Sequence, residues 1–339
     1  MTDTHPGRFD WRALWMALLV FTTLSSMTAQ QPSASLLVLN KEDNALAVVD
    51  LASLKVRGTV PTGAGPHEVT VSSDGKWAYV SNYGSFGSAA TPGHTISVID
   101  LVNLKQVQQF DLVALTKPHG IEYAEGKVYF TAELSRAIGR YDPVTNKVDW
   151  VMGTGQNRTH MLFPSRDMSK IVTANVDSDS VSIFERSKDA SGWSVTVIPV
   201  GKGPEGGSLS PDEKEFWAAN SHDSTVSIIN VGSAKVTQTI NVGTKHSNRL
   251  KFTPDGKLVL ISDLGSGDVV FVDVANRKVI KRLSAGKNAE GILIQPDGVR
   301  AYVAAADDGA VVIIDLKTLE IVGKIATGNG PDGMAWAVR

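Results

Sequence analysis

Histidine, carboxylate and amide side chains recur at long intervals in this chain. Imidazole and carboxylate groups are the usual ligands of Zn²⁺ and the usual proton carriers in catalysis. The series has seven polar members: His67, His119, His160, Glu205, Asn248, Glu290 and Asp332. Successive members lie 52, 41, 45, 43, 42 and 42 residues apart. These spacings match no short metal-binding motif, so the series predicts a site only if a repeated structure brings its members together.

Each member occupies the same place in a repeated pattern. The pattern opens with Gly-x-Gly-Pro or a variant, continues through an apolar strand to an Asp-Gly turn, and adds two further short apolar strands. Glycine in such turns supplies the positive φ of a tight reversal, as in 73–76. A period in the low forties with about four strands per repeat is typical of a β-propeller blade. We therefore predict an all-β, seven-bladed β-propeller with four-stranded antiparallel blades.

The two ends of the repeat region predict how the ring closes. The last repeat contains one inner strand, 331–337, whereas residues 36–60 contain three outer strands without an inner one. Pairing the N-terminal strands with the C-terminal strand completes the seventh blade and removes the unpaired edges. The alternative is an open six-bladed array with two unpaired ends.

The first 29 residues are typical of a secretory signal peptide. Arg8 and Arg12 precede an apolar run over 13–24, and small residues lead up to Ala29. Twelve apolar residues are too few to span a bilayer comfortably, so we expect cleavage near Ala29 and no membrane span in the mature chain. An uncleaved anchor is the alternative. Residues 30–339 are then a single propeller domain, located in the bacterial periplasm or secreted.

Composition narrows the classes of function. The chain has no cysteine, so disulfides, a thiol nucleophile and covalent haem attachment are excluded. The formal net charge of −2 argues against nucleic-acid binding. The G-x-G-x-x-G at 201–206 opens a strand, not the helix that a dinucleotide site requires.

Two sets of residues resemble known propeller families. Tyr79-Val80-Ser81-Asn82, followed by strands that end in Val-Ile-Asp, resembles the YVTN-type repeat of YncE-like bacterial propellers, and 171–175 and 216–220 are degenerate copies. That resemblance covers nearly the whole mature chain and implies the propeller fold. The blade at 118–142 is similar to repeats of streptogramin lyase and gluconolactonase-like propellers, and these relatives imply that catalysis is an alternative.

Propeller topology places the first two positions of every inner strand at the mouth of the central channel. We therefore expect the ligand-binding residues to be His67, Glu68, His119, Arg158, His160, Glu205, Asn248, Arg249, Glu290 and Asp332. The three histidines are the expected ligands of a divalent metal ion, with the carboxylates opposite completing its shell. The alternative is a water-filled channel that has polar walls and no ligand.

Further features are expected near the same mouth. Six cations lie at or within three residues of the series: Lys117, Arg158, Lys202, Lys245, Arg249 and Lys287. Of these, Arg158 and Arg249 are expected to orient an anion. An insertion at 83–94 lengthens one loop on this face, with Tyr83, Phe86 and His94 as residues that would face a ligand. Similar loops carry carboxylates such as Glu133, for which turn capping is the expected role.

The sequence leaves three hypotheses for function. The first is an exported binding or scaffold protein, whose partner is a small polar or anionic ligand, a metal ion or another envelope protein. The second is a metal-assisted lyase or lactonase-like enzyme in which His119 or His160 moves a proton. The third is binding of single-stranded nucleic acid, which the neutral charge disfavours.

Overall fold

The computed structural model describes residues 1–4, 34–85, 90–189 and 192–338. It separates Met1–Pro32 from a second unit, Ser33–Arg339, which is the propeller. The predicted signal peptide lies, apart from residues 1–4, outside the described residues. Within the described part of the chain, no helix is long and apolar enough to cross a membrane.

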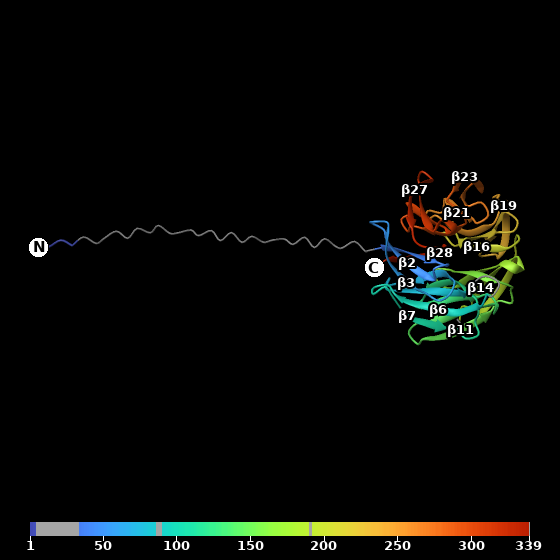
Figure 1. The fold of residues 1–339 in the computed structure, drawn as a ribbon, viewed down its shortest axis with the longest axis horizontal. Helices are drawn as coiled ribbons and strands as arrows, with labels where there is room; N and C mark the ends of the chain where they lie inside the picture. Colours follow the sequence, from blue (N-terminus) through green and yellow to red (C-terminus); the bar gives the residue numbers. More distant parts are fainter. Residues whose placement is uncertain (5–33, 86–89, 190–191, 339) are drawn as a thin grey trace. The chain divides into compact units, whose positions relative to one another are not determined.

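The described part of the second unit consists of seven four-stranded antiparallel sheets, which confirms the predicted fold (Figure 1). We number the blades from the one that carries His67 and give the strands from the inside outward. Blades 1 to 3 are β4 (Pro66–Val71), β5 (Trp77–Gly84), β6 (Pro92–Asp100), β7 (Lys105–Asp111); β8 (Pro118–Ala124), β9 (Lys127–Ala132), β10 (Ala137–Asp142), β11 (Lys147–Gly153); and β12 (Thr159–Pro164), β13 (Lys170–Asn175), β14 (Ser180–Arg186), β15 (Trp193–Pro199).

The remaining blades repeat this order. Blades 4 to 6 are β16 (Pro204–Leu209), β17 (Glu215–Asn220), β18 (Thr225–Asn230), β19 (Lys235–Asn241); β20 (Ser247–Phe252), β21 (Leu258–Asp263), β22 (Asp268–Asp273), β23 (Lys278–Ser284); and β24 (Ala289–Ile294), β25 (Arg300–Ala305), β26 (Ala310–Asp315), β27 (Glu320–Ala326). Blade 7 is β28 (Pro331–Val338), β1 (Ala34–Asn40), β2 (Ala45–Asp50) and β3 (Lys55–Pro61). Two 3₁₀ helices, η1 (Val176–Ser178) and η2 (Ala306–Asp308), lie in loops.

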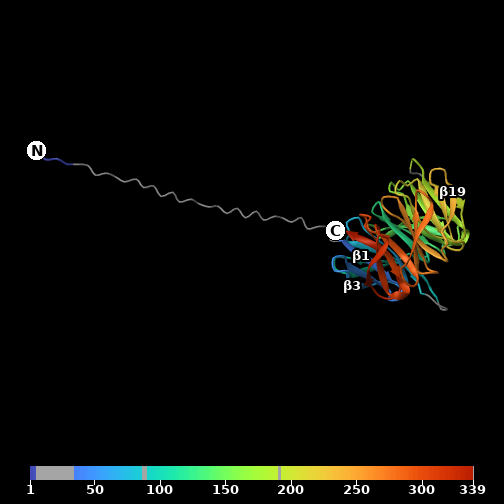
Figure 2. The same cartoon turned by 90° about the horizontal axis from the view of Figure 1, so that it is seen from above.

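Blade 7 closes the ring as predicted. β28 pairs antiparallel with β1, with Trp336 opposite Leu36 and Met334 opposite Val38. Figure 2 shows the C-terminal end of the chain beside β1. The inner strand of every blade also contacts the inner strand of the next, including β28 with β4. The sheets therefore form a complete circle in which each blade packs against two neighbours.

The core lies between the blades. Seven apolar clusters of described residues each join two neighbouring blades, one cluster at each interface of the ring. The cluster between blades 7 and 1, for example, packs Leu37 and Val48 against Val80 and Ile99. Removing this apolar surface from water is the main stabilising contribution, because each blade is too thin to bury a core alone.

The YVTN-type motif has a structural role here. Asn82, its last residue, donates through Nδ2 to Thr95 Oγ1 at 2.9 Å and to Ser97 Oγ at 3.0 Å on the next strand. Asn220 makes the same pair of bonds with Thr225 and Ser227 in blade 4. The motif therefore ties two strands together within a blade, and its presence predicts the fold without predicting a ligand.

Candidate functional site

All seven members of the polar series line one cavity of about 340 Å³ at the mouth of the channel. We call this cavity the channel-mouth chamber. The rest of its lining consists of Lys41, Tyr83, Lys117, Arg158, Arg249 and Leu264. The repeat alignment therefore predicted correctly which side chains converge, whereas the ligand-binding role of these residues stays a prediction.

Hydrogen bonds from the YVTN-type strands set the position of two histidines. Ser81 of β5 donates through Oγ to the carbonyl of His119 at 2.6 Å, and Thr131 of β9 donates to the carbonyl of His160 at 2.8 Å. The Ser or Thr of one blade thus holds the ring residue of the next blade. Gly120 allows the close approach, because a Cβ there would lie 2.9 Å from Met161 Cα.

A second ring consists of the residue that follows the YVTN-type position on the second strand of each blade. In each case its backbone N–H donates, at 2.8–3.0 Å, to the residue that precedes the inner strand. The members are Lys41, Tyr83, Glu133, Val176, Ser221, Leu264 and Ala306. Of these residues only Tyr83 and Glu133 were expected near the mouth, and aligning the residue after each YVTN-type motif predicts the whole ring.

Two cations neutralise the acidic side of the chamber. Lys41 forms an ion pair with Glu290 and lies 3.3 Å from Asp332. Arg249 reaches across the channel from blade 5 to blade 1, where it forms an ion pair with Glu68 through Nη2 and a 3.0 Å hydrogen bond through Nε. Burial raises the pKa of Glu290, and the charge of Asp332 adds to that effect.

Glu205 also has partners on this side. Asn248 Nδ2 donates to Glu205 Oε1 at 3.0 Å, and His246 Nε2 lies 3.3 Å from Oε2. Burial alone would raise the pKa of Glu205, but the hydrogen bond from His246 and the charges of His160 and Arg249 lower it to about 2. Glu205 is therefore ionised at neutral pH, and its Oε1 lies 3.8 Å from His160 Nε2.

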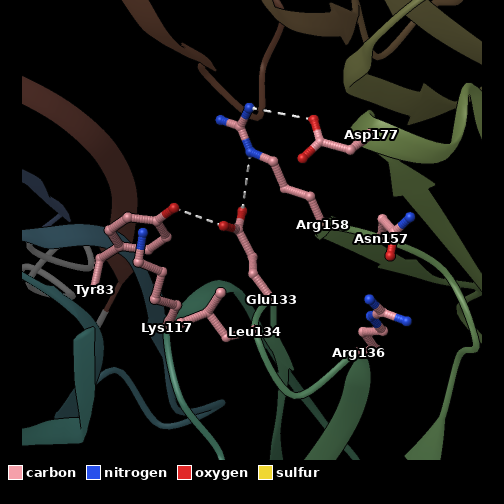
Figure 3. A pocket seen from close by; sticks show the side chains of 8 residues that line it. All are labelled: Tyr83, Lys117, Glu133, Leu134, Arg136, Asn157, Arg158 and Asp177. Carbon is pink, nitrogen blue, oxygen red and sulfur yellow. Dashed lines mark hydrogen bonds and ion pairs between the residues drawn. The ribbon is translucent and has the colours of Figure 1, made fainter.

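Three imidazoles lie side by side on the opposite side of the chamber. The ring centroids of His67 and His119 are 4.8 Å apart, and those of His119 and His160 are 3.7 Å apart. Glu133 binds Nδ1 of His160 through Oε1 and accepts a 2.6 Å hydrogen bond from the Tyr83 hydroxyl through Oε2. Figure 3 shows the Glu133 carboxylate between Tyr83 and Arg158. A carboxylate that holds one nitrogen of a histidine fixes the ring with the other nitrogen free to bind.

Two buried nitrogens in this group have no hydrogen-bond partner among the described residues: Nδ1 of His119 and Nε2 of His160. One ligand atom each from His119, Glu133 and His160 lies within 4.8 Å of the others, and all three residues are buried. Burial, and then the neighbouring imidazoles, hold the pKa of His119 well below its usual value. Its ring is therefore neutral at neutral pH and offers a lone pair, as a metal ligand must.

Other residues predicted for the site are not part of the group of His119, Glu133 and His160. His67 is outside that three-residue group, and its Nδ1 lies 3.0 Å from the Gly65 carbonyl. Arg158 lines the chamber, with Nε 3.9 Å from Glu133. His94 pairs with Asp111 at 2.9 Å in an exposed position, and Phe86 falls outside the described residues. Of the predicted cations, Lys202, Lys245 and Lys287 are absent from the chamber lining.

Comparison with known proteins identifies the family. A model of the YNCE-like β-propeller matches residues 151–337, which is more than half of the chain. The chain belongs to the YNCE-like β-propeller family. This membership confirms the resemblance seen in the YVTN-type motif. No protein of curated function matches the sequence significantly.

Solved structures share the fold of this YNCE-like chain. Hydrazine synthase from Kuenenia stuttgartiensis is 19% identical with a TM-score of 0.65, over 79% of this chain and 88% of that chain. A putative 6-phosphogluconolactonase from Bacteroides uniformis is 14% identical with a TM-score of 0.71, over 91% and 100%. A second, from Bacteroides fragilis, is 17% identical with a TM-score of 0.71, over 91% and 99%. At such identities the likeness shows the propeller fold alone.

Proposed function

We propose that this protein is a binding propeller that holds one divalent transition-metal ion in the channel-mouth chamber, on His119 and His160. The observation that supports this most is the pair of buried imidazole nitrogens without hydrogen-bond partners, next to a third residue of ligand type. Buried polar atoms in a folded protein almost always have a partner, so these two nitrogens are open to a ligand or a water molecule.

The donor set indicates which ions fit. Imidazole nitrogen suits Zn²⁺ and Cu²⁺, whereas Ca²⁺ and Mg²⁺ require oxygen ligands. Nitrogens bound to one tetrahedral Zn²⁺ lie about 3.3 Å apart, and the ligand atoms of His119, Glu133 and His160 already lie within 4.8 Å of one another. In this proposal Glu133 orients His160, and Glu205 supplies a second carboxylate beside the ion.

The ion pairs on the acidic side of the chamber also favour a metal site on His119 and His160. Glu290, Asp332 and Glu68 already have cationic partners in Lys41 and Arg249. An ion on the acidic side would compete with ammonium and guanidinium groups, whereas Nδ1 of His119 and Nε2 of His160 have no hydrogen-bond partner among the described residues. Two of the three predicted histidine ligands thus remain in the proposal, and the role of His67 stays a prediction.

Metal titration of protein purified without a histidine tag tests the proposal. After removal of metals with a chelator, we expect one Zn²⁺ per chain and no binding of Ca²⁺ at the same concentration. The double variant H119A/H160A should lose at least about 100-fold in Zn²⁺ affinity, because both ligands are gone. The matched control is H94A, which removes an exposed histidine outside the chamber. Equal affinity of H119A/H160A and wild type would refute the proposal.

The enzyme hypothesis makes a different prediction for the same protein. A lyase or lactonase would turn over lactone substrates when loaded with Zn²⁺, and the H119A variant would lose that turnover. Tight Zn²⁺ binding with no turnover by wild type favours the binding protein. The blade at 118–142 motivates this comparison, since its sequence is similar to repeats found in propeller enzymes.

We also propose that the protein is exported. The support is the N-terminal sequence, in which Arg8 and Arg12 precede an apolar run over 13–24. Fractionation of the producing cells and N-terminal sequencing of the mature chain test this proposal. We expect a periplasmic or secreted chain that begins close to residue 30, and a full-length chain in the cytoplasm would contradict it.

A further inference from the structure

A second cavity, of about 440 Å³, adjoins the chamber between the loops of blades 2 and 3 (Figure 3). It shares Tyr83, Lys117 and Arg158 with the chamber lining and has Glu133 in its own wall. The volume falls in the range of small-molecule sites. Because Glu133 binds His160, this cavity lies directly beside the proposed metal ligands.

The charged side chains that line this cavity include more cations than carboxylates. Lys117, Arg136 and Arg158 all line it, against the carboxylates of Glu133 and Asp177. Both oxygens of Glu133 are already engaged, by His160 and Tyr83. Arg158 is shared between Glu133 and Asp177 at 3.9 Å each, which is a long distance for an ion pair.

The other two cations are available to a ligand. Among the described residues, neither Lys117 nor Arg136 has an acidic side chain within ion-pair distance, and Lys117 Nζ lies 4.7 Å from the centre of the Tyr83 ring. A guanidinium can bind a carboxylate through two parallel hydrogen bonds, and a nearby ammonium adds a further charged donor. This combination matches an oxyanion better than an apolar ligand.

The backbone has positive φ at all three cations, Lys117, Arg136 and Arg158. In most blades the residue before the inner strand has positive φ. Where this residue is uncharged, it is Gly65, Gly203, Asn288 or Gly330. Blades 2 and 3 instead have Lys117 at φ 53° and Arg158 at φ 51°. Glycine avoids the steric cost of this region, so Lys117 and Arg158 add backbone strain in the two blades that carry His119 and His160.

From this geometry we infer that the cavity is an anion subsite, in which Lys117 and Arg136 attract a small organic dianion and one of its carboxylates reaches the ion on His119 and His160. Only the contact between the ligand's carboxylate and the ion rests on the proposed function. The cations and the cavity do not depend on the metal. The expected ligand class is thus a small dicarboxylate.

Calorimetric titration with succinate tests the subsite, with metal-free and Zn²⁺-loaded full-length protein as two arms. We expect succinate to bind in both arms, and at least about tenfold more tightly with Zn²⁺ present. The double variant K117Q/R136Q should lose about tenfold or more in succinate affinity in both arms, since two charged donors are removed. It should bind Zn²⁺ at least as tightly as wild type, because two positive charges near the ion are gone.

The controls match each change. K202Q removes a lysine from the equivalent loop of blade 4 that lines neither cavity, and it should bind succinate like wild type. Succinamide has the same shape without charge and should not bind. Both glutamine variants change exposed or half-buried side chains, so we expect them to fold, and their thermal unfolding verifies this.

The outcomes separate the two proposals. Succinate binding that is lost in K117Q/R136Q, in a protein that takes no Zn²⁺, supports the subsite and refutes the metal site. Zn²⁺ binding with no succinate binding, or with equal succinate affinity in K117Q/R136Q and wild type, refutes the subsite alone. Inorganic phosphate that binds through Lys117 and Arg136 as tightly as succinate, with no enhancement of either by Zn²⁺, overturns the assignment to a dicarboxylate.

Discussion

Glu133 connects the hydrogen bonds at the channel mouth with the proposed metal ligand His160. It holds His160 by Nδ1, accepts from Tyr83, and so leaves Nε2 of His160 without a hydrogen-bond partner among the described residues. Although burial alone would raise the pKa of Glu133, the charge and hydrogen bond of His160 lower it. An ionised carboxylate at this position makes the His160 ring a stronger ligand and fixes its tautomer.

Replacing Glu133 by glutamine should therefore weaken metal binding. We expect E133Q to lose about 10–100-fold in Zn²⁺ affinity, because the uncharged amide is a poorer acceptor for His160 Nδ1–H. The measurement is a competition titration against a chromogenic chelator. D177N is the matched control, since Asp177 lies at the rim and contacts Arg158 only at 3.9 Å. Wild-type affinity in E133Q would show that Glu133 does not orient the ligand.

Glu122, three residues beyond His119 on β8, should make stability depend on pH. Burial, reinforced by Glu68 and opposed by Lys251, raises the pKa of Glu122 from its ordinary 4.5 to about 7. The folded protein therefore binds more protons than the unfolded chain between these pH values, and its stability falls as pH rises across that window.

The variant E122Q should remove this part of the pH dependence. We expect it to be more stable than wild type at pH 8, by on the order of 1 kcal/mol, and similar to wild type at pH 4.5. Urea unfolding at both pH values gives the comparison, with E42Q at an exposed position as the control. The same loss of stability with pH in E122Q and wild type would contradict the assignment.

At the scale of elements, the second and inner strands of neighbouring blades form the unit that positions the site. Thr131 is fully buried on β9, accepts a 2.9 Å bond from Gly120 N–H and donates to the His160 carbonyl. A single hydroxyl thus connects the strand segments that carry His119 and His160. Ser81 plays the same part between blades 1 and 2.

The isosteric variant T131V should both destabilise the fold and disturb the site. It leaves the Gly120 N–H without its acceptor, at a cost of about 1–3 kcal/mol, and the two histidines should lose alignment. Chemical denaturation and Zn²⁺ titration measure the two effects. T145V, which removes a hydroxyl that bonds to Asp142 in an outer turn, should affect stability modestly and leave Zn²⁺ affinity as in wild type. Unchanged Zn²⁺ affinity in T131V would contradict the positioning role.

Elements were more predictable from sequence than the contacts between side chains. The repeat aligned His67, His119 and Asp332 because strand spacing and Asp-Gly turns recur in every blade, and backbone geometry places equivalent positions on one ring. The role of Glu133 and the Arg249–Glu68 pair across the channel were not predictable. Both depend on side-chain conformations in non-repeated surroundings, and the two members of the Arg249–Glu68 pair are 181 residues apart.

At the scale of the whole molecule, closure of the ring keeps the chamber in place. Blade 7 combines the first and last strands of the propeller, and it contributes both Lys41 and Asp332 to the chamber. Its strands also complete the apolar clusters at two interfaces. Loss of one strand therefore affects the core and the chamber together.

Ending the chain after Gly330 should abolish stable folding. This change removes β28, exposes the edge of β1, and opens the circle at the interface with blade 1. We expect no cooperative thermal transition by circular dichroism. A circular permutant is the matched control: it joins residues 338 and 34 by a short linker and has new ends in the turn at 74–76, and it should unfold like wild type. Wild-type melting of the truncated chain would contradict closure as the source of stability.

The most direct measurement for the proposed site is anomalous diffraction at the zinc edge from crystals of the Zn²⁺-loaded protein. The proposed metal site predicts one strong peak in the channel-mouth chamber, about 2.0–2.1 Å from Nδ1 of His119 and from Nε2 of His160. An empty chamber, or zinc bound only to exposed residues such as His94, would contradict it.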